Sequence, residues 1–108
     1  MKLSPYQISK IDTKIEINPK RIIVAIDLSE DKDMLPAEEI CSNIYCVDDQ
    51  YEIIWQVKEL KTKVPFDDDM FVNLSKNDTG EILARRFSGF TYQIDPDTGE
   101  AVQNGFSK

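Results

Sequence analysis

Short runs of alternating apolar and polar residues, separated by polar turns, recur along this 108-residue chain. Successive side chains of a β-strand point to opposite faces, so a period of two predicts strands. The predicted strands lie at residues 15–17, 21–28, 44–47, 51–57, 70–74, 82–87, 90–94 and 101–103. The sequence therefore predicts one domain over residues 1–108, a mainly β antiparallel meander of about eight short strands in two blade-like sheets, forming a sandwich or a partial propeller.

One predicted strand differs from the others because it is apolar on both faces. In the stretch 21–28, Ile22 and Val24 alternate with Ile23 and Ala25. A strand that is apolar on both sides is typical of the middle of a buried sheet. We therefore expect this strand to be central.

Two segments lack the alternation. Residues 29–42 contain Pro36 followed by Glu38 and Glu39, and proline in the first turn with acids near the positive end of the dipole favours a helix start. We expect one short helix or ordered loop near residues 34–42. The charged stretch 59–69 is predicted to be a long exposed loop.

The tetrapeptide Asp-Thr-Gly-Glu occurs twice, at residues 78–81 and 97–100. Both copies suit a type I turn closed by a left-handed glycine, the common three-residue hairpin loop with a bulge. Aspartic proteases also carry Asp-Thr-Gly, but there an apolar strand buries the triplet. Here Asp78 follows Lys76-Asn77, Asp97 follows Asp95-Pro96, and each triplet is succeeded by glutamate, so turns are favoured. Two such hairpins predict a four-stranded meander.

The residues that usually carry catalysis or bind metals are scarce. The chain has no histidine, which removes the commonest general base and metal ligand. Asp95 and Asp97 supply too few ligands for a calcium loop, and the spacing of Cys41 and Cys46 fits neither a redox motif nor a zinc site. We therefore predict a protein that is not an enzyme, with no catalytic residues, no metal and no cofactor, and with both cysteines as reduced structural thiols.

Twenty acidic and thirteen basic residues give a net charge of −7. Such a charge repels nucleic acids and anionic membranes and attracts cationic partners, although solubility alone would also account for it. No apolar run approaches the length of a membrane span, and the first residues lack the apolar core of a signal peptide. We expect a cytoplasmic protein that binds neither nucleic acid nor membrane.

Clusters of acidic residues are the candidate binding sites on this surface. Three consecutive aspartates repel one another and seldom help folding, so they lead the candidates. The predicted electrostatic binding residues are Asp67, Asp68, Asp69, Asp48, Asp49, Glu30, Asp31 and Asp33. The alternative is that they are ordinary turn residues, because aspartate favours turns. Trp55 alternates in phase with Ile53 and Val57, which favours a place in the core over a binding role.

Two stretches of the sequence resemble known repeats. Residues 43–57, NIYCVDDQYEIIWQV, resemble the strand-turn-strand of a propeller repeat ending in Trp, and residues 90–100, FTYQIDPDTGE, resemble another strand of the same repeats. Over residues 43–103 the chain is similar to small bacterial immunity proteins of contact-dependent growth inhibition systems. The resemblance implies a cytoplasmic protein that blocks a toxin domain, often a nuclease. Two blade-like units are too few to close a propeller ring.

Charge and resemblance together predict an immunity protein that binds a cognate, cationic nuclease toxin, for example an RNase, and occludes its active site. A nuclease site is cationic because it holds phosphates, so acidic loops would complement it. The free protein is expected to be a monomer. One alternative is a non-catalytic β-rich adaptor that binds through an exposed sheet edge. A second is a carbohydrate-directed lectin or enzyme, which requires an exposed Trp55.

Overall fold

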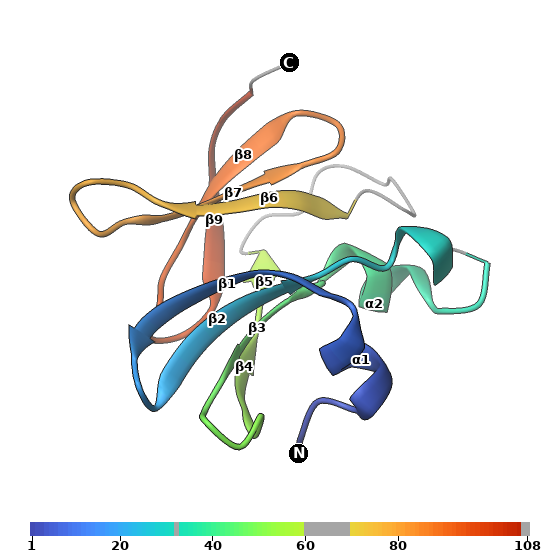
Figure 1. The fold of residues 1–108 in the computed structure, drawn as a ribbon. Coiled ribbons are helices and arrows are strands. Elements are labelled where there is room, and N and C mark those ends of the chain that lie inside the picture. Colours follow the sequence, from blue (N-terminus) through green and yellow to red (C-terminus); the bar gives the residue numbers. More distant parts are fainter. Residues whose placement is uncertain (32, 60–69, 107–108) are drawn as a thin grey trace.

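Two mainly antiparallel β-sheets lie face to face in the computed structural model, which describes residues 1–31, 33–59 and 70–106 (Figure 1). The first sheet has the order β1 (Ile11–Asn18), β2 (Arg21–Ile26), β3 (Ile44–Val47) and β4 (Ile53–Gln56). The second has the order β5 (Lys58–Glu59), β9 (Glu100–Phe106), β8 (Phe90–Ile94), β7 (Ile82–Arg86) and β6 (Phe71–Lys76), with the short β5 parallel to β9. The prediction of a mainly β fold with about eight short strands in two sheets is confirmed.

In the described residues, three short helical segments accompany the sheets: α1 (Pro5–Ser9), the 3-10 turn η1 (Ser29–Asp31) and α2 (Ala37–Cys41). The helix expected near residues 34–42 is α2. The helix α1 was not expected, although its capping box is visible in the sequence. Gln7 donates its backbone N–H to Ser4 Oγ, and Ser4 donates its own to Gln7 Oε1, with Pro5 in the first turn.

The main core fills the space between the two sheets. Its buried members come from both sheets: Ile23, Ala25, Ile44, Cys46, Trp55, Val57, Phe71, Leu74, Ile82, Ala84, Tyr92, Ile94 and Ala101. Trp55 is only 8% exposed, so its predicted place in the core is confirmed. Cys46 is a buried thiol, and the desolvation that comes with burial raises its pKa.

A second core lies on the other face of the first sheet. Alternate residues of β2 and β3, including Val24, Ile26 and Val47, pack there against Leu3, Leu28, Ile40 and other apolar side chains. The first sheet is therefore buried on both faces, which confirms that β2 is central. The second sheet instead exposes polar residues such as Asn73, Ser75 and Gln93 on its outer face.

Buried polar side chains connect the two sheets. The amide of Asn43 donates to Ile26 O at 2.8 Å and to Phe71 O at 2.9 Å, and it accepts from Phe71 N at 3.0 Å. Arg86 lies over the Phe71 ring, 4.1 Å from its centroid, and donates to Cys41 O at 3.0 Å. These bonds satisfy polar groups that would otherwise be costly to bury, and they fix β6 relative to the first sheet.

The two Asp-Thr-Gly-Glu segments form hairpin turns with left-handed glycines, as predicted: φ is 86° at Gly80 and 81° at Gly99. In the first turn Asn77 N donates to Glu81 O and closes the expected three-residue loop. The second loop is one residue longer than expected. Proline occupies the position before Asp97 and has no N–H, so Asp95 N donates to the carbonyl of Glu100 instead.

Candidate functional site

Two edge strands, β1 of the first sheet and β6 of the second, pack near each other on one side of the sandwich, and each carries a β-bulge there. The pairing of β1 with β2 shifts register at Asp12, and the pairing of β6 with β7 shifts at Val72. A bulge bends its strand and locally interrupts pairing. A pocket of about 300 Å³, here called the groove, opens between the two bulges. Its lining residues are Asp12, Thr13, Ala25, Ile26, Asp27, Ser29, Met70, Phe71, Val72, Asn73, Leu74 and Phe87.

The groove is apolar in its depth and differs between its two sides. Its buried lining comprises Ala25, Ile26, Met70, Phe71 and Leu74. On the side of the first sheet the lining is polar, with Asp12 and Asp27. On the side of the second sheet the lining is open and mostly apolar, with Val72 39% and Phe87 76% exposed beside the exposed amide of Asn73. An exposed phenylalanine beside an apolar pocket is a feature typical of binding surfaces.

Asp27 is held at the polar side of the groove by its neighbours. Its backbone N–H donates to Lys10 O at 2.8 Å, and its Oδ1 accepts from Ser29 N at 2.9 Å. Hydrogen bonds from the side chain and backbone of Ser29 lower the pKa of Asp27, aided by the nearby Lys10 charge and opposed by partial burial. Asp27 is therefore ionised at neutral pH. Asp12 lies at the bulge of β1, where its carboxylate accepts from Thr13 Oγ1 at 3.4 Å.

Three of the predicted binding residues continue this negative surface beyond the groove. Glu30 Oε1 accepts from Lys10 Nζ at 2.9 Å, and Asp31 Oδ1 accepts from the Tyr6 hydroxyl at 2.6 Å. This hydrogen bond from Tyr6 to Asp31 is the main cause of the raised pKa of Tyr6. Asp33 is exposed, next to an 81% exposed Met34.

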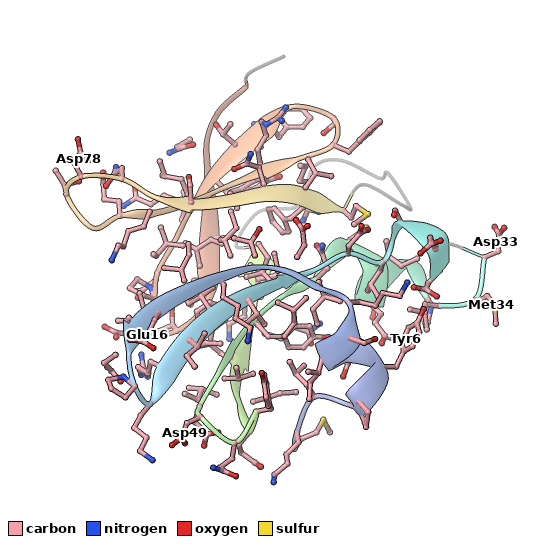
Figure 2. All side chains as sticks on the ribbon, viewed as in Figure 1. Tyr6, Glu16, Asp33, Met34, Asp49 and Asp78 are labelled. Atoms are coloured by element: carbon pink, nitrogen blue, oxygen red, sulfur yellow. The ribbon has the colours of Figure 1, made fainter. Side chains whose placement is uncertain are left out.

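The negative residues at this end of the first sheet are here called the acidic end: Asp12 and Asp27, which line the groove, and Glu30, Asp31 and Asp33, which follow β2 in the chain. They come from the start of β1, the end of β2 and the segment that follows it. Figure 2 shows Asp33, Met34 and Tyr6 on the same side of the molecule. The sequence prediction named three of these five residues and missed Asp12 and Asp27.

Two other predicted residues, Asp48 and Asp49, do not join the acidic end. Asp48 lies in the turn between β3 and β4, where its Oδ1 accepts from Gln50 N and Glu52 N at 2.8 and 2.9 Å. These hydrogen bonds, that from Glu52 first, lower the pKa of Asp48. Asp49 pairs with Lys20 at 2.9 Å and lies apart from Asp33 in Figure 2. Asp48 thus has the structural turn role that was the alternative for these residues.

Asp67, Asp68 and Asp69 lie outside the described residues, as does most of the stretch 59–69 predicted to be a loop.

Trp55 cannot serve the carbohydrate-directed alternative in this fold. That alternative requires an exposed indole, whereas Trp55 is buried and donates its Nε1–H to Pro96 O at 2.9 Å.

Phe87 is the most exposed of the aromatic side chains that the structure describes, ahead of Tyr6, and sequence reasoning placed it at the end of a strand. Its position directly before Ser88-Gly89 was the available signal, because a residue entering a tight turn leaves the sheet.

Within residues 1–31, 33–59 and 70–106, no group of three acidic, cysteine or histidine side chains is placed to hold a metal ion. In the same residues, no helix is long and apolar enough to cross a membrane.

Comparison with curated proteins and with solved structures gives no match. A family model described as a domain of unknown function, DUF7957, matches residues 8–106. The matched stretch contains all nine strands, the groove and the acidic end. The chain therefore belongs to the DUF7957 family.

Proposed function

We propose that this chain is an immunity-type protein, which binds a cationic toxin domain through the acidic end and the adjoining groove and thereby blocks the toxin's active site. The observation that carries the proposal is an apolar groove with an exposed phenylalanine and two aspartates in its lining, next to a chain segment that carries three more acidic residues. The resemblance over residues 43–103 supplies the class of partner.

The electrostatic part of the proposal follows from the distribution of charge. Carboxylates at one end of a molecule with a net charge of −7 create a directional field, and such fields steer cationic partners and raise association rates. Lys10 pairs with Glu30 at the surface, where an ion pair contributes little and can exchange partners. The acidic end can therefore face a nuclease surface that is built to hold phosphates.

The apolar part supplies affinity. Interfaces owe most of their binding energy to a few buried aromatic or long side chains, surrounded by polar residues that exclude water. Phe87, Val72 and Met34 are exposed apolar side chains near the acidic end and could be buried by a partner. Charge would then govern the capture rate, and the apolar contacts would govern the lifetime of the complex.

The first test is a growth assay. The C-terminal domain encoded immediately upstream of this gene is expressed alone and together with the chain. We expect the domain alone to stop growth and co-expression to restore it. If the upstream domain is harmless, or stays toxic when the chain is co-expressed, the proposal is contradicted.

The second test measures affinity against salt with two triple variants. Glu30→Gln, Asp31→Asn and Asp33→Asn remove three charges from the acidic end. A matched control removes three exposed charges elsewhere: Glu16→Gln, Asp78→Asn and Asp97→Asn. We expect the first variant to bind about tenfold or more weakly and with a shallower salt dependence, and the control to bind almost normally. If both triple variants lost the same affinity, the net charge of the chain, and not the acidic end, would account for binding.

The adaptor alternative remains a second candidate, because β1 and β6 have outer edges that no other described strand covers. Such edges can accept a strand from a partner. Strand addition rests on backbone hydrogen bonds, so it predicts affinity that hardly changes with salt. The salt series therefore separates the two candidates.

A further inference from the structure

The groove has the layout of a site for a long side chain with a charged tip. At about 300 Å³ it lies at the lower limit of ligand pockets, so it suits a single side chain better than a large ligand. Its depth is apolar, whereas Asp12 and Asp27 lie on one side of its opening. Lysine and arginine combine an apolar stem with a cationic head, and they bury the stem while the head stays near water or a counter-ion.

Phe87 lies on the other side of this opening. It is exposed, and its ring can cover a guanidinium or ammonium group that approaches the carboxylates. The same chain already contains such a contact, because Arg86 lies over the ring of Phe71. A cation in the groove would therefore meet carboxylates on one side and an aromatic ring on the other.

We propose that the groove receives one lysine or arginine side chain of the protein partner, with its stem against Met70 and Phe71 and its cation between Phe87 and the carboxylates of Asp12 and Asp27. This inference rests on the proposed function, since it names how that partner is held. The charge complementarity of the groove is what selects a basic side chain over an apolar one.

Two groove variants test the proposal in affinity measurements with the upstream toxin domain. Asp12→Asn with Asp27→Asn removes both charges, and asparagine at 27 keeps an oxygen that can accept from Ser29 N. Phe87→Ala removes a ring that is largely in solvent, so folding should be unaffected. Each variant is expected to bind about tenfold or more weakly. The matched controls are Asp78→Asn and Val102→Ala, an exposed carboxylate and a 53% exposed valine outside the groove, and both should bind like the wild type.

A competition experiment tests the nature of the occupant. N-ethylguanidinium chloride and n-butylammonium chloride imitate the two side chains, and sodium chloride at the same ionic strength is the reference. At least one organic cation should weaken toxin binding more than sodium does, and the excess should vanish in the Asp12→Asn, Asp27→Asn variant. Fluorescence of Trp55 monitors whether the fold stays intact.

The outcomes separate this inference from the function on which it rests. If the toxin binds but the groove variants behave like their controls, or if the organic cations act only as salt, the groove inference is overturned and the immunity proposal stands. If the toxin does not bind the wild-type chain, the proposed function is overturned and the inference with it.

Discussion

The two Asp-Thr-Gly-Glu turns have the same residues and nearly the same glycine conformation, yet they differ in what surrounds them. A Cβ added at Gly80 would meet nothing within 4 Å. A Cβ added at Gly99 would lie 2.5 Å from Cε3 and 2.7 Å from Cδ2 of Trp55. The first turn is a free hairpin tip, whereas the second is part of the contact between the sheets.

The difference comes from one inserted residue. Pro96 lengthens the second loop, and its carbonyl accepts both from Trp55 Nε1 at 2.9 Å and from Arg21 Nη1 at 3.0 Å. Both donors belong to the first sheet, so the loop of the second sheet is held against it. The local sequence determines the glycine conformation, and the tertiary partners determine how much the turn contributes to stability.

The largest effect is expected for Gly99→Ala. The methyl group would collide with the Trp55 ring, and alanine at φ 81° is strained. Strain of ~1–2 kcal/mol and overpacking of ~1–3 kcal/mol predict a loss of roughly 3 kcal/mol in the free energy of unfolding, measured by urea denaturation. Trp55 fluorescence should change as well. A loss no greater than that of Gly80→Ala would mean that the Trp55 contact gives way easily.

Trp55→Phe should have an intermediate effect on the same contact. Phenylalanine keeps an aromatic ring but loses the hydrogen bond to Pro96 O, which retains the bond from Arg21. The free energy of unfolding should fall by ~1–2 kcal/mol, because one hydrogen bond is lost and the smaller ring packs less well. Urea denaturation monitored by circular dichroism measures this loss. In the double variant with Gly99→Ala the losses should be less than additive, because the smaller ring leaves room for the methyl group. Strict additivity would argue against a shared contact.

Gly80→Ala should cost only ~1 kcal/mol, because the new methyl group meets open space and only the left-handed backbone is strained. Trp55 fluorescence should stay unchanged. A cost near that of Gly99→Ala would show that backbone strain, and not contact with Trp55, dominates both turns.

The smallest effect concerns the charge at the first turn. Hydrogen bonds from Asn77, then from Thr79 and Gln93, hold the pKa of Glu81 below its usual 4.5. Because the pKa of Glu81 is lower in the folded than in the unfolded chain, its ionised carboxylate stabilises the fold at pH values above the unfolded pKa. This stabilisation is lost as the pH falls through the folded pKa. Thr79→Val removes one of these bonds and should move the pKa of Glu81 upward, as measured by NMR titration. If the pKa of Glu81 does not move, the hydrogen bonds from Asn77 and Gln93 are sufficient to keep it low.

Eight of the nine described strands, the central β2, the buried Trp55 and both turn glycines could be predicted, because each depends on local alternation or on turn chemistry; the two-residue β5 was not predicted, because it exists only through its pairing with the distant β9. The helix α1 was also predictable from the spacing of Ser4 and Gln7. The bulges at Asp12 and Val72 were not, since a bulge arises from the pairing of two distant segments. The groove lies between these bulges, so Asp12, Asp27 and Phe87 were not named from the sequence, whereas Glu30, Asp31 and Asp33 were named because they cluster along the chain.

The strands of the two sheets follow one another in the sequence: β1 to β4 form the first sheet, and β6 to β9 form most of the second. Most strand pairs are therefore hairpin neighbours, and such local pairing favours fast folding among β proteins. The two halves share an apolar interface and side-chain hydrogen bonds such as those of Asn43, but among the described strands only the short β5 of the first half pairs with a strand of the second. A chain divided between residues 59 and 70 would leave two fragments that are each unable to bury an inner face alone, which makes this domain suited to reassembly from two separately expressed halves.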